Sequence, residues 1–279
     1  GNNAGNSSQG ISSIAIGDFA GGTKQEGYAV AVGQRAGQSN QGDGAVAIGA
    51  GAGRSNQKYT AVAIGGGAGY SNQSEYSIAV GNSAGEFSQS TKALAIGNNA
   101  GNSSQGCNAV SIGYYTGQYN QGIHAVAVGG RAGNSSQGCN AVSIGYYTGQ
   151  TKQGIHAVAV GGSAGNSSQG CNAVAVGYQA GMSNQGSQST AVGPSAGHSS
   201  QGIGATAIGW ETGQTNQGIS ATAIGNNAGN SSQGIGATAI GKDAGNSNQG
   251  SGAVAVGNFA GRTSQGSQSV AIGYQAGNT

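Results

Sequence analysis

The sequence predicts an all-β fold, a parallel β-solenoid (β-roll) of about 17 sixteen-residue coils with two short strands per coil. A 16-residue unit repeats without insertion through residues 1–272, and a partial unit fills 273–279. The consensus is G-x-x-A-G-x-S-x-Q-G-x-x-A-V-A-I, so each unit ends in alternating small and β-branched residues and carries glycine at fixed places. We number the positions of the unit 1 to 16, with Gly1, Gly17 and Gly33 at position 1.

The A-V-A-I run at positions 13 to 16 has the two-residue period of a β-strand. Residues 45–48 and 61–64 are examples. A second extended piece is expected over A-G-x-S-x-Q, at positions 4 to 9. Glycine follows it at position 10 in 13 of the 17 units. Glycines at positions 1, 5 and 10 favour turns, and each would destabilise a helix by about 1 kcal/mol.

Position 9 is glutamine in every complete unit. Coils of a solenoid stack at about 4.8 Å, the strand spacing, so identical amides lie above one another. They can then hydrogen-bond along the axis, as Asn and Gln do in cross-β stacks. We predict a structural glutamine ladder that includes Gln9, Gln25, Gln41, Gln57, Gln73, Gln89 and Gln105.

The alternation in A-V-A-I gives each strand two faces. We expect Val and Ile to fill the interior and the small residues to face outward as a smooth, uncharged strip that packs against another chain. This candidate interchain packing strip comprises Ala29, Ala31, Ala45, Ala47, Ala61, Ala63, Ser77 and Ala79. Four units have threonine at the expected core position, namely Thr190, Thr206, Thr222 and Thr238.

The unbroken phase of the repeat predicts one continuous repeat domain over residues 1–279, with no linker. Repeat arrays need capping segments at their ends. Since no cap is visible and the last unit is partial, we expect the sequence to be a segment of a longer protein.

The composition excludes several functional classes. Charged residues make up 6% of the chain, and there are 3 Phe, 1 Met and 1 Trp to fill a core. Because no loop interrupts the repeat to build a pocket, we expect no enzymatic activity and no cofactor. The net charge of +2 forms no basic stripe for nucleic acid. No run of about 18 apolar residues is present to span a membrane.

Cysteine and histidine recur with the repeat. Cys107, Cys139 and Cys171 are two coils apart, which puts their Cα atoms about 9–10 Å apart, beyond the roughly 7 Å limit for a disulfide. We expect free thiols within one chain, and the odd number leaves an interchain link open. His124 and His156 are copies in a duplicated segment, and no set of three or four converging ligands is apparent, so no metal site is predicted.

Tyrosines gather at two duplicated places, with Tyr114 beside Tyr115 and Tyr146 beside Tyr147. An exposed aromatic row can contact carbohydrate. The alternative is that these tyrosines are turn residues copied with the rest of the duplication.

The run AVAIGAGAG at 45–53, repeated as AVAIGGGAG at 61–69, resembles the head repeats of trimeric autotransporter adhesins. TAIGNNAG at 222–229 and VAIGYQAG at 270–277 are similar to repeats in fibre proteins of tailed phages and large algal viruses. The resemblance covers the whole chain, although the adhesin unit is typically shorter than 16 residues. It implies a left-handed parallel β-roll with three chains side by side, and an extracellular fibre or adhesin.

We therefore expect a rod-like structural or adhesive fibre segment, exposed on a cell or virion surface. The expected partners are copies of this chain, in a trimer or filament joined by the Ala/Ser face or open ends, and a host-surface or carbohydrate ligand. One alternative is an amyloid-like subunit that self-assembles end to end through its open edges. Ice binding is a more distant alternative, because ice-nucleation proteins carry Thr-x-Thr rows where Ala-x-Ala is expected here.

Overall fold

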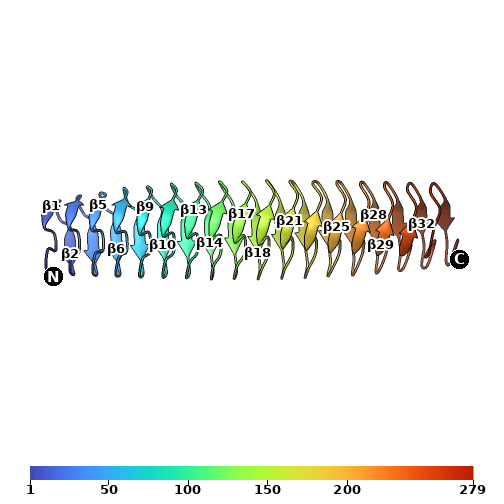
Figure 1. Cartoon of the computed structure of the whole chain (residues 1–279), viewed down its shortest axis with the longest axis horizontal. Coiled ribbons are helices and arrows are strands. Elements are labelled where there is room, and N and C mark those ends of the chain that lie inside the picture. The colour runs from blue at the N-terminus through green and yellow to red at the C-terminus, as the bar shows by residue number, and fades with distance from the viewer. Residues whose placement is uncertain (279) are drawn as a thin grey trace. The chain divides into compact units, whose positions relative to one another are not determined.

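The computed structural model describes residues 1–278 and confirms the fold class, an all-β parallel solenoid of about 17 coils with two short strands in each (Figure 1). The chain divides into two compact units, residues 1–140 and 141–279, which we call the first unit and the second unit. Each 16-residue repeat within them is one coil. The same coil pattern recurs within each unit. That the two units form one continuous domain stays a prediction.

Two parallel sheets line the first unit, one built from positions 7 to 9 and the other from positions 14 to 16. The first sheet runs β1 (Ser7–Gln9), β3 (Thr23–Gln25), β5 (Ser39–Gln41), β7 (Ser55–Gln57), β9 (Ser71–Gln73), β11 (Phe87–Gln89), β13 (Ser103–Gln105), β15 (Tyr119–Gln121) and β17 (Ser135–Gln137). The second sheet runs β2 (Ile14–Ile16), β4 (Val30–Val32), β6 (Val46–Ile48), β8 (Val62–Ile64), β10 (Ile78–Val80), β12 (Leu94–Ile96), β14 (Val110–Ile112) and β16 (Val126–Val128).

The second unit has the same two sheets. At positions 7 to 9 lie β19 (Thr151–Gln153), β21 (Ser167–Gln169), β23 (Ser183–Gln185), β25 (Ser199–Gln201), β27 (Thr215–Gln217), β29 (Ser231–Gln233) and β31 (Ser247–Gln249). At positions 14 to 16 lie β18 (Val142–Ile144), β20 (Val158–Val160), β22 (Val174–Val176), β24 (Thr190–Val192), β26 (Thr206–Ile208), β28 (Thr222–Ile224), β30 (Thr238–Ile240), β32 (Val254–Val256) and β33 (Val270–Ile272).

Each strand pairs with the equivalent strand of the neighbouring coil, 16 residues away, for example Val46 with Val62 and Ile48 with Ile64. The strands are shorter than predicted, because only the last three residues of each extended piece pair as a strand. Like residues therefore lie above like residues, which is the arrangement that the constant 16-residue phase predicts.

Each coil turns tightly because five of its positions, 1, 3, 5, 8 and 12, have positive φ. In the coil of residues 33–48, φ is 128° at Gly33, 58° at Arg35 and 51° at Gly37. It is 55° at Asn40, in the middle of β5, and 64° at Gly44. A non-glycine residue in the left-handed region costs about 1–2 kcal/mol, so packing and hydrogen bonds must hold these turns.

Backbone hydrogen bonds between coils hold the turns. The N–H groups of Gly37 and Gly42 donate to Ala52 O (2.9 Å) and Gln57 O (2.7 Å) in the following coil. In the other direction, Arg35 N–H donates to Asp18 O (2.8 Å) in the preceding coil. The backbone N–H and C=O groups of the turns thus hydrogen-bond to neighbouring coils, as those of the strands do.

The interior is narrow and filled by small residues. Ala at positions 4, 13 and 15 and Gln at position 9 are buried in nearly every coil. A Cβ added to Gly69, at position 5, would lie 3.2 Å from the Cβ of Ala63 and 2.5 Å from Oε1 of Gln73. No methyl group can be added there, so the opposite walls of the coil are already in contact.

The predicted direction of the A-V-A-I side chains is wrong. The whole candidate packing strip is buried inside its own coil, and each of its residues, Ala29, Ala31, Ala45, Ala47, Ala61, Ala63, Ser77 and Ala79, has 0% exposure. The threonines expected in the core, Thr190, Thr206, Thr222 and Thr238, are half-buried and point outward with the Val and Ile side chains. The physical reason is space at positions 13 and 15, where the narrow interior holds only Ala and Ser; buried threonine occurs at position 4, as in Thr116, Thr148 and Thr212.

Candidate functional site

The main exposed feature of both units is the outer Val/Ile face, formed by the side chains at positions 14 and 16 of the second sheet. Its most exposed members in the first unit are Ile14, Ile16, Ile48, Ile64, Ile78, Ile96 and Ile112. In the second unit they are Ile144, Val176, Ile208, Ile224, Ile240, Val270 and Ile272. Typical internal members, such as Ile48 and Ile208, are 39% exposed. The face is therefore partly accessible in every coil.

The outer Val/Ile face carries no charge. Positions 14 and 16 hold Val, Ile, Leu or Thr in every complete unit. The side chains form two parallel rows, with neighbours in a row about 4.8 Å apart and the two rows about 6.7 Å apart. A regular apolar surface of this kind can pack against another regular surface without burying an ion.

The glutamines at position 9 lie in the interior and bond along the stack. Gln57 has 0% exposure, and its Nε2 donates to Val46 O (2.8 Å), Ala61 O (3.0 Å) and Gln73 Oε1 (3.2 Å). The Nε2 of Gln41 in turn donates to Gln57 Oε1 at 3.2 Å. The amide of Gln57 thus joins its own coil to the preceding coil, through Val46 O, and to the following coil, through Gln73 Oε1.

The amide-to-amide bonds are not continuous. In the first unit they run from Gln41 to Gln105 and join Gln121 to Gln137; in the second they join Gln153 to Gln169 and run from Gln217 to Gln265. At Gln121 the Oγ of Ser111 donates to Oε1 instead, at 2.7 Å. Gln9, the first of the predicted ladder, is exposed. The bonds from Nε2 to backbone carbonyls are therefore the more general contribution of this residue.

The cysteines and histidines do not converge. Cys107, Cys139 and Cys171 are free thiols. The backbone N–H of His124 donates to Cys107 O at 2.9 Å, but its Nε2 lies 3.2 Å from Nδ2 of Asn108. Through residue 278, no three His, Cys, Asp or Glu side chains are grouped where they could hold a metal ion. No helix in that same stretch is long and apolar enough to cross a membrane.

The paired tyrosines lie at positions 2 and 3 of their coils, on the turn that follows the second sheet. The rings of Tyr114 and Tyr115 meet edge to face with centroids 4.4 Å apart, and those of Tyr146 and Tyr147 at 4.3 Å. Tyr114 is 55% exposed and Tyr146 is 63% exposed. Desolvation, and then the neighbouring Tyr115, raise the pKa of Tyr114 above its usual value, so its phenol is neutral at pH 7. The four side chains offer aromatic surface on this turn.

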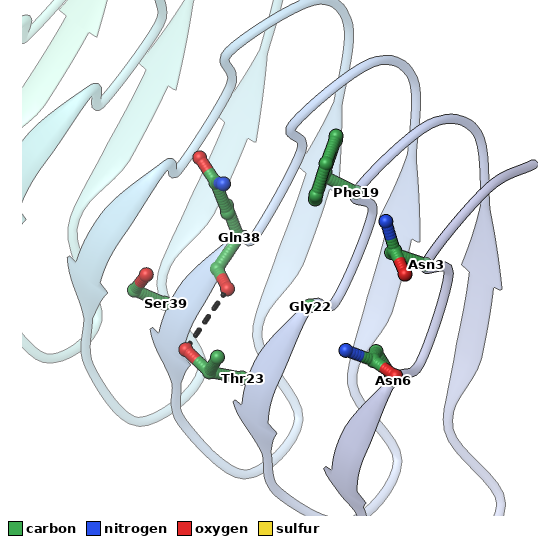
Figure 2. A pocket seen from close by; sticks show the side chains of 7 residues that line it. All are labelled: Asn3, Asn6, Phe19, Gly22, Thr23, Gln38 and Ser39. Carbon is green, nitrogen blue, oxygen red and sulfur yellow. Dashed lines mark hydrogen bonds between the residues drawn. The ribbon is translucent and has the colours of Figure 1, made fainter.

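A hollow of about 220 Å³ lies in the first unit, lined by Asn3, Asn6, Phe19, Gly22, Thr23, Gln38 and Ser39 (Figure 2). It forms because Gly22 occupies position 6, where Asn6 and Gln38 stand in the neighbouring coils. Thr23 Oγ1 donates to Gln38 O at 3.2 Å across it. The lining consists of amides, hydroxyls and one phenyl ring, with no acid, base or cation. Its chemistry suits hydrogen bonding rather than proton transfer.

The features that stand out among residues 1–278 are therefore exposed surfaces. Sequence reasoning found the glutamines and tyrosines but missed the outer Val/Ile face, which it placed in the core. No protein-family model matches the chain, and no curated protein matches it.

Proposed function

We propose that this chain is a non-enzymatic structural or adhesive segment of an extracellular fibre, in which copies pack side by side through the outer Val/Ile face. The observation that carries the proposal is the exposure of an uncharged row of β-branched residues in coil after coil, outside a core that is already closed. The extracellular location rests on the resemblance of the AVAIG repeats to those of adhesin heads and viral fibres.

A second copy of the chain is the partner that fits this face best. The rows repeat once per coil, about every 4.8 Å. Two surfaces interdigitate over many coils only when their periods agree, and a copy of the same chain has the same period. The absence of charge at positions 14 and 16 means that no ion is buried when two copies meet.

The energetics require a long contact. Burying an isoleucine completely contributes about 1.5–3 kcal/mol, so covering the exposed 39% of Ile208 contributes about 1 kcal/mol. Association costs about 4–15 kcal/mol because the partners lose translational and rotational freedom. A contact over one or two coils is too weak, whereas several coils in register are enough. Lateral assembly should therefore depend on the number of coils.

We expect the combined substitution of Ile208, Ile224 and Ile240 by lysine to convert the assembled chain to a smaller species. These residues lie at position 16 of adjacent pairing strands, and each lysine would bring an unpaired charge into the interface. Sedimentation velocity gives the assembly state, and circular dichroism checks that the coils remain folded.

The matched control places three lysines on the first sheet, as Asn216→Lys, Ser232→Lys and Asn248→Lys. Position 8 already holds Lys24 and Lys152, so lysine fits there. The control should assemble as the unmodified chain does. A folded, monomeric unmodified chain would contradict the proposal, and ice shaping by that monomer would favour ice binding instead. Filaments that persist in the isoleucine variant would favour end-to-end stacking.

A further inference from the structure

A row of exposed aromatic side chains occupies position 2 in alternate coils of the second unit. Tyr146, Tyr178 and Trp210 are spaced by 32 residues and are 63%, 61% and 60% exposed. The coils between them have Gly162 and Pro194 at this position. Large aromatic surfaces therefore alternate with small residues along one corner of the unit.

Backbone hydrogen bonds keep this corner in register. The N–H of Ser163 donates to Tyr146 O at 2.9 Å, and that of Gln179 donates to Gly162 O at 2.9 Å. Two further bonds, from Ser195 to Tyr178 O (2.8 Å) and from Asn227 to Trp210 O (3.0 Å), repeat the pattern. The aromatic residues are thus separated by two coils each, or about 9.5 Å.

The intervening small residues leave room for the rings. A Cβ on Gly162 would lie 3.4 Å from Cδ2 of Tyr178, so the tyrosine ring lies beside the space that a side chain at 162 would fill. The Tyr146 ring packs against the Tyr147 ring at an interplanar angle of 88°. The rings are separate platforms rather than one continuous stack.

We propose that this aromatic row binds an extended, neutral β-1,4-linked polysaccharide, of the cellulose or chitin class. A pyranose ring presents an apolar C–H face that stacks on an aromatic ring, while its hydroxyls stay in water. In a β-1,4-linked chain alternate sugars present the same face, and the disaccharide repeat is close to the two-coil spacing of Tyr146, Tyr178 and Trp210. Every second sugar therefore meets one aromatic platform.

The residues that follow the platforms supply hydrogen bonds. Gln179 and Glu211 come directly after Tyr178 and Trp210, and their N–H groups are fixed on Gly162 O (2.9 Å) and Pro194 O (3.0 Å) of the preceding coil. Their amide and carboxylate groups can bond to sugar hydroxyls at the edge of a stacked ring. The inference goes beyond the proposed lateral assembly and does not depend on it, since it uses position 2 rather than positions 14 and 16.

The test is co-sedimentation of the full chain with microcrystalline cellulose and with chitin, with soluble amylose competing. Replacing Tyr146, Tyr178 and Trp210 together by alanine should weaken binding about tenfold or more, because three stacking contacts are lost. The control replaces three exposed tyrosines outside the row, Tyr28, Tyr59 and Tyr76, by alanine, and should bind as the unmodified chain does. Amylose, with a different repeat, should not compete.

A second variant tests the spacing itself. Tyr178→Gly combined with Pro194→Tyr keeps the number of aromatic residues at position 2 but removes the even two-coil interval, so it should bind as weakly as the alanine variant. Failure of the unmodified chain to bind cellulose or chitin would overturn the inference, as would equal losses in the row and control variants. Sedimentation velocity, run in parallel, shows whether the assembly state has changed and so separates this result from the proposed lateral packing.

Discussion

Replacing Gly225 by alanine is expected to separate two neighbouring coils, whereas replacing Gly236 in the same coil should cost only about 1–2 kcal/mol. Gly225 is at position 1 with φ of 128°, and Gly236 is at position 12 with φ of 64°. The left-handed value at Gly236 is one that other residues adopt at position 12, such as His124 at 57°. The value at Gly225 lies in a region that is essentially restricted to glycine.

Steric contact increases the difference. A Cβ on Gly225 would lie 2.7 Å from the carbonyl oxygen of Gly241 and 2.8 Å from its carbon, whereas a Cβ on Gly236 meets nothing within 4 Å. Backbone atoms of the next coil cannot move without breaking bonds such as that from Gly241 N–H to Ile224 O, at 2.8 Å. We therefore expect Gly225→Ala to destabilise the unit by about 4 kcal/mol or more.

Hydrogen exchange measured by mass spectrometry is the suitable readout, because coils of a repeat protein can open locally. Peptides from the coils on either side of residue 225 should lose protection in Gly225→Ala and keep it in Gly236→Ala. Equal protection in the two variants would mean that the close approach at position 1 does not govern stacking.

The coil itself could be predicted from the sequence because its signals are local and periodic. The 16-residue phase predicts stacking, the A-V-A-I alternation predicts a strand, and the fixed glycines at positions 1 and 5 predict turns. The positive φ values at positions 3, 8 and 12 could not be predicted, because residues such as Arg35, Lys24 and Tyr28 stand there. Their conformation is imposed by bonds to neighbouring coils, which no local preference reveals.

The inward face could not be assigned from alternation, which separates two faces without saying which is buried. The usual expectation that Val and Ile fill the core fails here because the coil is too narrow for them at positions 13 and 15. One signal in the sequence does point the other way. Positions 13 and 15 hold only Ala or Ser in every complete unit, whereas position 14 varies among Val, Ile, Leu and Thr. A strict upper limit on size is what a closed interior imposes.

The candidate surfaces follow from the same geometry. Once Ala31 and Ala47 are inside, Val30 and Val32 must face outward, and the outer Val/Ile face exists in every coil. The 32-residue interval between Tyr146, Tyr178 and Trp210 is visible in the sequence. That the three residues share one corner of the coil could not be predicted from the interval alone. It follows from the register of the turns in the structure.

Replacing Gln57 by alanine should destabilise the first unit by about 4 kcal/mol or more, through two losses that a second variant separates. The glutamine is the largest side chain in the narrow interior, so its removal leaves a cavity, for which about 2–5 kcal/mol is typical of large-to-alanine changes. It also removes the donor to Gln73 Oε1 at 3.2 Å and the donor to Val46 O at 2.8 Å, while Gln41 Nε2 keeps its bonds to Val30 O and Ala45 O. A buried polar group left unsatisfied costs about 1–3 kcal/mol.

Gln57→Met preserves most of the side-chain volume and removes only the hydrogen bonds. Its free energy of unfolding should therefore lie between those of Gln57→Ala and the unmodified chain, about 2 kcal/mol below the latter. The control is Gln9→Ala, because Gln9 is exposed and its Nε2 makes only a 3.4 Å bond to Ser13 O. That change should cost less than about 1 kcal/mol. Urea denaturation, monitored by circular dichroism, ranks the variants by their free energy of unfolding. If Gln57→Met were as stable as the unmodified chain, the glutamine would serve to fill the coil, and its amide bonds would contribute nothing to stacking.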